Sequence, residues 1–423
     1  MAIVDQSLLS ATNFITSFLL ARLCTEQEFG SFAIAFSLLL FTGGIQQALV
    51  IVPMSVLGAS RSGDEFKAYV RGTACCQLLL VLATATIAVM ASLVFLASTG
   101  NTELTEVLLA MSTVMLPVHA KEFLRRFFLT KLQVWKGLAI DVMSSALQLA
   151  GLIALWGFGS DGWSPSNPGM LTAARTFWVV GLAALAALVL GLILSRGVVR
   201  LSVMDFRSAL RENWSFGKWQ LGQQMGIFGF NQANVLVVAA FLGRSGAAML
   251  EAPRLLVAPL QILVMAATTI LTPKASQAFV SGGIRKAMRV VLPAALFLEA
   301  TTVAYLVVLL CCPWLLEAIF GPKYAGASLI LMLWATAYLF ISPKIMMGSL
   351  LSSVRRPDLT MYSFLIAGAV MITLSASMVP ILDVPGSLLA RCVAEASACT
   401  LLALSVRRVV RASRQRTVST LRT

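Results

Sequence analysis

The sequence predicts an all-α integral membrane protein with twelve transmembrane helices in two pseudo-symmetric six-helix lobes around a central polar cavity. Three observations support this prediction. The chain is 58% hydrophobic and only 12% charged, whereas a soluble domain has about 45–50% apolar and about 25% charged residues. Apolar stretches of membrane-spanning length recur along it. The loops between them alternate between basic and non-basic composition.

The apolar stretches set the number of spans, because a helix needs roughly 20 apolar residues to cross the hydrocarbon core. We expect spans near 3–23, 31–58, 69–98, 104–128, 135–158, 171–194, 216–242, 247–273, 287–312, 325–350, 359–380 and 385–406. A short turn joins the first two spans. We expect Glu26 and Glu28 to face water in this turn, and Gly30 to help the chain reverse.

Basic residues give the orientation. They gather in every second loop, namely 61–71, 121–136, 196–218, 274–289 and 354–358, and in the tail after residue 406. Lysine and arginine resist translocation, so these segments and both termini are assigned to the cytoplasm. The net charge of +14 follows from this asymmetry, and no nucleic-acid partner is predicted.

The two halves of the chain resemble one another. The segment "ALVIVPMS" (48–55) is similar to "TTILTPKA" (268–275), and Pro117 matches Pro343 at a comparable offset. Transporters commonly place their substrate between such repeats. We therefore predict an N-terminal lobe over 1–195, a cytoplasmic interfacial linker over 196–218, a C-terminal lobe over 219–406 and a basic tail over 407–423.

Polar residues recur at helical spacing inside several spans. The stripes comprise Gln6, Ser10, Asn13 and Ser17; Gln46 and Gln47; Gln220, Gln224, Asn231 and Asn234; and Glu251, Arg254, Gln261, Thr268 and Thr272. One stripe alone is explained by hydrogen bonds between helices. Stripes on matching helices of both halves predict a shared water-filled cavity.

Charged residues inside spans cost roughly 2.5–3.5 kcal/mol each on insertion scales and therefore indicate function or pairing. The candidates are Asp5, Asp141, Arg175, Glu251, Arg254, Glu299, Lys344, Arg391 and Glu395. Glu251 can pair with Arg254, and Arg391 with Glu395, at helical spacing. Lys344 and Glu299 have no partner close in sequence.

Motifs of soluble catalysis are missing from the sequence. It contains no GxxxxGK[ST] phosphate loop, no G-x-S-x-G elbow and no HExxH motif, so no nucleotide hydrolysis by that route and no enzyme activity are predicted. One histidine and seven scattered cysteines do not form a zinc site. We expect no metal and no cofactor.

Two short motifs resemble those of a known family. The segment 4–54 is similar to the start of bacterial polysaccharide-biosynthesis flippases of the multidrug/oligosaccharidyl-lipid/polysaccharide exporter superfamily: Leu20, Ala21 and Arg22 close one helix, and Glu28, Phe29 and Gly30 follow a short turn. A second family-like turn contains Phe320, Gly321, Tyr324 and Ala327. The resemblance covers the whole chain, except that "MAIVDQ" starts almost within the first helix, where relatives usually have a longer lead.

This resemblance implies that the protein flips an undecaprenyl-diphosphate-linked sugar from the inner to the outer leaflet of the bacterial cytoplasmic membrane by alternating access. The glycan would be of the O-antigen, lipopolysaccharide or exopolysaccharide type. The expected partners are the lipid-linked oligosaccharide, membrane lipids, and a glycan polymerase and glycosyltransferases, with the protein acting as a monomer.

Physical chemistry suggests roles for individual residues. Arginine and lysine suit phosphate oxygens, and amides suit sugar hydroxyls. We expect Arg254 and Lys344 to bind the diphosphate. The expected sugar ligands are Gln46, Gln47, Asn231, Asn234, Gln261 and Asn13. The coupling or gating candidates are Asp5, Glu251 and Glu299.

Three alternatives remain open at this stage. A cation-coupled multidrug exporter of the same superfamily would favour acids, and Asp5, Asp141 and Glu251 support it. An integral-membrane glycan polymerase or ligase would need a large outer loop, but the longest one, 159–169, has only Asp161 as an ionisable group. A non-transporting scaffold for glycan synthesis would leave the polar stripes without a purpose.

Overall fold

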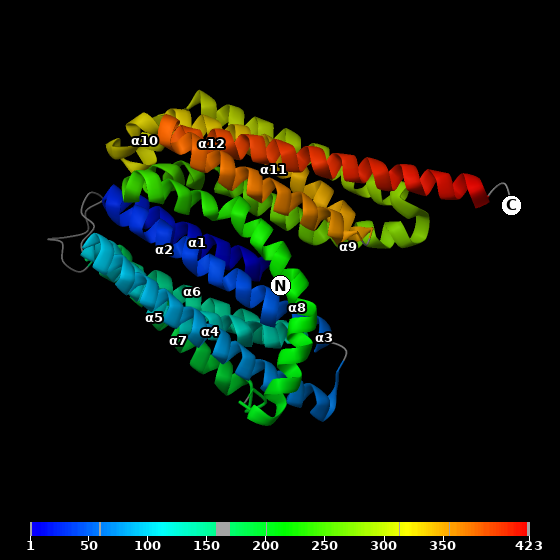
Figure 1. Ribbon diagram of the computed structural model, residues 1–423, viewed down its shortest axis with the longest axis horizontal. Coiled ribbons are helices and arrows are strands. Elements are labelled where there is room, and N and C mark those ends of the chain that lie inside the picture. Colours follow the sequence, from blue (N-terminus) through cyan, green and yellow to red (C-terminus); the bar gives the residue numbers. More distant parts are fainter. Residues whose placement is uncertain are drawn as a thin grey trace. The chain divides into compact units, whose positions relative to one another are not determined.

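The computed structural model describes residues 2–58, 61–157, 170–199, 201–312, 314–354 and 356–420. Every regular element in these ranges is a helix, which confirms the all-α class. The chain forms two compact units, Met1–Gln224 and Met225–Thr423 (Figure 1). The predicted outer loop 159–169 with Asp161, and the side chain of Asp5, lie outside the described residues.

The N-terminal unit contains the first six predicted spans. Its elements are α1 (Ala2–Leu23), α2 (Glu26–Gln46), the π-helical turn η1 (Gln47–Ile51), α3 (Val52–Leu57), α4 (Gly63–Thr99), α5 (Thr102–Thr130), α6 (Val134–Gly157) and α7 (Ala173–Leu194). The second span runs without interruption through α2, η1 and α3. Helices α4, α5, α6 and α7 lie side by side (Figure 1).

Helix α8 (Val203–Asn231) joins two regions that the sequence treats as separate. The predicted linker 196–218 and the start of the seventh predicted span share this one continuous helix. The rest of that predicted span forms the start of α9, which follows its N-cap residue Gln232. The boundary between the two compact units falls within α8, after Gln224.

The C-terminal unit contains two very long helices that are interrupted by breaks. Its elements are α9 (Ala233–Cys311), α10 (Trp314–Phe320), the 3-10 turn η2 (Pro322–Ala327), α11 (Ser328–Ser353) and α12 (Pro357–Thr420). Positive φ angles interrupt α9 at Gly243 (71°) and Gly283 (68°), and α12 at Asp383 (52°). This backbone region suits glycine and is tolerated by aspartate. The breaks divide these helices into segments that match the predicted spans.

Length and hydropathy agree with a membrane protein. Within the described part of the chain, nine helical segments are long and apolar enough to cross a membrane. This count is three lower than twelve. The apolar part of α1, Ser7–Leu23, is shorter than a full span, the polar α8 is not among the nine, and α12 counts once although it contains two predicted spans. In the C-terminal unit, α9, α11 and α12 lie side by side (Figure 1).

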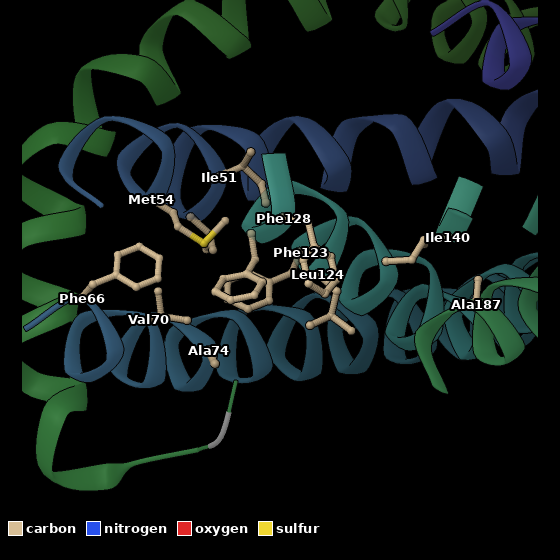
Figure 2. Packing of buried hydrophobic residues seen from close by; sticks show 12 residues of the cluster. Ile51, Met54, Phe66, Val70, Ala74, Phe123, Leu124, Phe128, Ile140 and Ala187 are labelled. Atoms are coloured by element: carbon tan, nitrogen blue, oxygen red, sulfur yellow. The ribbon is translucent and has the colours of Figure 1, made fainter. Parts of the chain in front are cut away.

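Apolar packing fixes one end of the N-terminal unit. Figure 2 shows Met54 beside Phe66 and Val70 of α4, with Ile51 and Phe128 of α5 further along the same cluster. Such buried aromatic and aliphatic side chains stabilise a fold by about 1.5–3 kcal/mol each.

The turn between α1 and α2 differs from its predicted form. Thr25 caps α2 by accepting a hydrogen bond from the Glu28 backbone N–H at 3.2 Å. The Glu28 carboxylate accepts from the backbone N–H of Ala173 at 2.7 Å, so it holds the first turn of α7. Gly30 lies buried inside α2. The predictions that Glu28 only faces water and that Gly30 makes the reversal are therefore wrong.

Candidate functional site

Three charged side chains form a buried cluster between α11 and α12. Lys344 Nζ donates to Glu395 Oε2 at 2.6 Å, and Arg391 Nη2 lies 3.3 Å from Glu395 Oε1. Glu395 is fully buried, and Lys344 and Arg391 are 6% and 5% exposed. One carboxylate faces two cations, so the triad carries an excess of one positive charge.

Aromatic rings and the end of α8 surround the two cations. Lys344 Nζ lies 4.2 Å from the Phe230 ring centroid, and the Arg391 guanidinium lies 4.7 Å from that of Trp334. Arg391 also donates to the Phe230 carbonyl at 3.1 Å and to Asn231 Oδ1 at 3.4 Å. A ring face attracts a desolvated cation, which helps to keep both charges in the interior.

The triad is incompletely hydrogen-bonded. Arg391 Nε and Glu395 Oε1 are both buried and have no hydrogen-bond partner. A buried polar group without a partner costs about 1–3 kcal/mol, and more when it is charged. The Arg391 guanidinium therefore has an unused donor that an additional acceptor could satisfy.

A second ion pair lies beside the triad. Arg254 and Glu251 of α9 approach to 2.8 Å. Trp334, whose ring faces Arg391, donates to the carbonyl of Leu250, the residue before Glu251, at 2.9 Å. The Tyr338 hydroxyl on the same helix as Trp334 lies 3.5 Å from Gln261 Oε1. Together with the triad, this pair makes three cations and two carboxylates, so the net charge is positive by one.

The structure places the other predicted residues of this unit in nearby positions. Asn231 binds Arg391, as described above, and Asn234 is buried, with Oδ1 accepting from Ser375 at 3.1 Å and Nδ2 lacking a partner. Glu299 has one buried carboxylate oxygen without a hydrogen bond. Leu298, the residue before Glu299, packs against Met346 of α11, two residues after Lys344.

The structure agrees with two sequence-based expectations for this unit. Lys344 has no partner close in sequence and is paired instead with Glu395, which is 51 residues away. Arg391 forms the expected pair with Glu395 at helical spacing, and this pair is buried. Its signal in the sequence was an arginine and a glutamate four residues apart within an apolar span.

The N-terminal unit has a neutral polar cluster centred on His119. The His119 carbonyl accepts from Gln46 Nε2 at 2.8 Å and from Gln77 Nε2 at 3.4 Å, and its ring nitrogen lies 3.0 Å from Thr42 Oγ1. Gln46 and His119 are buried. Gln47 is half-buried in the π-helical turn. The predicted amide Gln46 therefore hydrogen-bonds within its own unit.

Two acids inside this unit, Asp141 and Glu122, are paired with Arg125. Asp141 is fully buried and accepts a hydrogen bond from Arg125, and Glu122 approaches the same guanidinium at 3.1 Å. Removing one partner of a buried pair leaves an uncompensated charge, which costs about 3–5 kcal/mol. Asp141 therefore forms part of a structural ion pair.

Asn13 lies apart from the His119 cluster. It is exposed and lines a small hollow of about 30 Å³ with Thr16, Gln148 and three phenylalanines, among other residues. Gln148 donates to Thr16 at 2.9 Å across this hollow. A volume of this size holds only one or two water molecules, so this hollow by itself is too small for a sugar.

Comparisons with known proteins agree with this architecture. The structure is similar to an inward-facing multidrug resistance MATE family transporter of the MOP superfamily, with a TM-score of 0.74 and 14% identity over 95% of each chain. It is similar to the lipid II flippase MurJ in an inward closed conformation, with a TM-score of 0.74 and 13% identity, covering 96% of this chain and 87% of that one.

A third similar structure is a MOP superfamily transporter from Pyrococcus furiosus Vc1, described as having a binding pocket of reverse polarity. It has a TM-score of 0.62 and 12% identity, covering 96% of this chain and 93% of that one. At these identities the similarity establishes the fold, which is that of MOP-superfamily transporters. No curated protein sequence is significantly similar to the chain.

The sequence itself identifies the family. Residues 5–279, more than half of the chain, match the model for polysaccharide biosynthesis proteins. This match includes the Glu28 turn, the His119 cluster and the Arg254–Glu251 pair. The chain therefore belongs to the polysaccharide biosynthesis protein family.

Proposed function

We propose that this protein moves a polyprenyl-diphosphate-linked oligosaccharide from the inner to the outer leaflet of the bacterial cytoplasmic membrane by alternating access. The glycan is destined for a cell-surface polysaccharide. Glycosyltransferases would supply the substrate, and a glycan polymerase or ligase would consume the product. The observation that best supports this function is the buried cationic cluster of Lys344, Arg391 and Glu395.

The charge of the cluster favours an anionic ligand. Two buried cations share one carboxylate, and the unpartnered Arg391 Nε can still donate a hydrogen bond. A phosphate oxygen is a strong acceptor for a guanidinium, which binds phosphate in a bidentate geometry. A diphosphate would neutralise the excess charge and satisfy this donor. In this proposal Arg391 and Lys344 hold the diphosphate, and Arg254 contributes from the neighbouring pair.

Neutral polar groups around the cluster suit a sugar. Asn234 and Gln261 offer amides on α9, Tyr338 offers a hydroxyl on α11, and Asn231 offers an amide at the end of α8. Such groups both donate and accept hydrogen bonds, as sugar hydroxyls require. We assign the sugar of the substrate to these residues of the C-terminal unit.

Glu299 is the best-supported coupling residue in this proposal. Its buried carboxylate oxygen has no hydrogen bond, and the neighbouring Leu298 packs against Met346, two residues after Lys344. A group that can gain a proton or cation at this position would alter the charge of the cluster during the cycle. Glu251 already forms an ion pair with Arg254, so we assign it to gating rather than to coupling.

A multidrug exporter is the second candidate, because the fold is similar to that of MATE transporters. A site for cationic drugs needs carboxylates that are not neutralised by protein cations. Asp141 is bound by Arg125, Glu251 by Arg254, and Glu395 by two cations. Among the described acids considered for this role, only Glu299 lacks a salt bridge. The pairing pattern therefore favours an anionic substrate.

Complementation separates the two functions. A strain of the source organism that lacks this gene is complemented with the wild-type chain, with Arg391→Gln or with Arg285→Lys as a charge-preserving control at an exposed position. We expect wild type and control to restore surface glycan, and Arg391→Gln to fail at equal membrane abundance. Expression in an efflux-deficient host should leave resistance to cationic drugs unchanged. Drug resistance without glycan export would overturn the proposal in favour of the second candidate.

A further inference from the structure

Helix α8 separates its charges onto two sides. Successive residues are rotated by about 100° around a helix. Asp205 and Glu212, seven residues apart, therefore fall on one side. Arg207, Arg211 and Trp214 fall on the opposite side, and Lys218 continues that row. This segregation of charge indicates that the two sides of α8 face different surroundings.

The acidic side is docked firmly onto α4. Glu212 pairs with Arg61, which lies over the Tyr69 ring at 4.2 Å. The Tyr69 hydroxyl donates to Asn213 Oδ1 at 2.6 Å. Gly72 of α4 allows α8 to approach closely, since a Cβ at this position would lie 2.8 Å from the Ala209 Cβ.

A second glycine fixes the other end of this docked region. A Cβ on Gly217 would come within 2.8 Å of the Ala48 carbonyl oxygen, at the π-helical turn η1. Together with the α4 contacts, this approach fixes the rotation of α8 about its own axis. The direction in which the opposite side points is therefore set by the fold of the N-terminal unit.

The opposite side forms an open basic hollow. It has a volume of about 690 Å³ and is lined by Arg207, Leu210, Arg211 and Trp214. None of these described lining residues is a carboxylate. Trp214 is 54% exposed and Leu210 43% exposed. Tryptophan and arginine are enriched at membrane interfaces and also at binding hot spots.

We propose that this hollow is a loading site for the diphosphate and first sugar of the lipid-linked substrate at the inner membrane surface. The inference rests on the proposed function and deepens it. Arg207 and Arg211 are one helical turn apart, so two guanidinium forks can each bind one phosphate group.

The remaining side chains fit the rest of such a headgroup. The Trp214 ring offers an apolar face against which the carbon–hydrogen face of a sugar ring can pack. Leu210 offers apolar surface to the first isoprene units of the tail. A common phospholipid has a single phosphodiester and no sugar ring, so it would use one arginine and leave Trp214 without a function. These features favour the substrate over bulk anionic lipid.

The position of the hollow suits loading. It lies in the basic segment 196–218, which the distribution of lysine and arginine assigns to the cytoplasmic side. The substrate of the proposed function comes from that side. The same helix ends at Asn231, the residue that accepts a hydrogen bond from Arg391, so one helix carries the loading site and a ligand of the buried cluster.

The test measures flipping of an undecaprenyl-diphosphate-linked oligosaccharide in proteoliposomes of neutral lipid as a function of its mole fraction. A binding residue that acts before the transport step changes half-saturation and leaves the maximal rate unaffected. We expect Arg207→Gln/Arg211→Gln to raise the half-saturating mole fraction about tenfold, with a maximal rate within twofold of wild type. Trp214→Ala should raise the half-saturating mole fraction about threefold.

A matched control removes the same charge elsewhere. Arg285→Gln/Lys286→Gln alters two exposed basic residues of another loop predicted to be cytoplasmic, and should leave half-saturation unchanged. The inference is overturned if the Arg207/Arg211 variant saturates like wild type, if the control shifts equally, or if a tenfold excess of phosphatidylglycerol competes as well as substrate does. Wild-type protein that flips no substrate would instead refute the proposed function itself.

Discussion

Lys344 Nζ lies 2.6 Å from one oxygen of Glu395, and Arg391 approaches the other oxygen at 3.3 Å. One buried carboxylate thus serves two cations that come from different helices. This arrangement links α11 to α12 and leaves one excess positive charge in the triad, which can attract an anionic ligand. The triad therefore has both a structural and a binding role, which substitutions can separate.

Glu395→Gln should lower the stability of the protein. Removal of one partner from a buried charge pair typically costs about 3–5 kcal/mol, because the remaining charge is left uncompensated. We expect a clear fall in the thermal midpoint of the purified protein in detergent. The double variant Glu395→Gln/Lys344→Met should recover part of the loss. Equal midpoints for the single and double variants would show that Lys344 does not depend on Glu395.

Arg391 and Arg254 should contribute unequally to glycan export. Arg391 is buried with an unused donor, whereas the Arg254 side chain is 28% exposed and paired with Glu251. We expect Arg391→Lys, which keeps the charge but loses the guanidinium fork, to reduce glycan export more than tenfold.

Arg254→Ala should also abolish glycan export while the protein still reaches the membrane. Arg254→Lys should retain a measurable part of the wild-type export. Surface glycan per membrane-inserted protein measures both. Wild-type export by Arg254→Ala would remove this residue from the mechanism.

Glu28→Ala should destabilise the N-terminal unit without abolishing transport. The Glu28 carboxylate accepts from the Ala173 N–H at the start of α7, and loss of such a cap costs about 0.5–2 kcal/mol. Thermal unfolding of the purified variant measures the effect. Glu26→Ala, in the same turn, serves as the control and should melt close to wild type. If both variants melt alike, the contact between Glu28 and α7 has no energetic importance.

Gly72→Ala should loosen the docking of α8 on α4. The added methyl group would collide with Ala209 and with the backbone carbonyl of Asp205, and overpacking of this kind costs about 1–3 kcal/mol. Gly222→Ala is the matched control, because nothing lies within 4 Å of its Cβ position and alanine favours helix. We expect the first variant to melt earlier and the second to melt at or above the wild-type midpoint. The reverse order would contradict the α4–α8 contact.

Local sequence features were sufficient to predict the helices. Apolar length located the spans, and Gly243 and Gly283 mark where the long helix α9 breaks. Contacts between distant residues were not predictable, because hydropathy contains no information about which helices meet. Glu395 is 51 residues from Lys344, and Ala173 is 145 residues from Glu28. The sequence therefore indicated that Lys344 was unusual but not what it binds.

The acids illustrate the same limit. Asp141 supported a drug-exporting alternative because a lone carboxylate in a span suggests a cation site. Its partner Arg125 lies in the preceding helix, at a position that the sequence assigns to a basic loop. Pairing across helices converts the apparent cation site into a neutral contact, and this depends on three-dimensional packing alone.

The most direct test of the central claim is the affinity of the purified protein for undecaprenyl diphosphate in neutral-lipid nanodiscs. The Arg207→Gln/Arg211→Gln background confines binding to the buried cluster. We predict that this protein binds the diphosphate, that adding Arg391→Gln weakens binding at least tenfold, and that the cation tetraphenylphosphonium does not compete. Undiminished binding after Arg391→Gln, or displacement by tetraphenylphosphonium, would contradict an anion site built on Lys344 and Arg391.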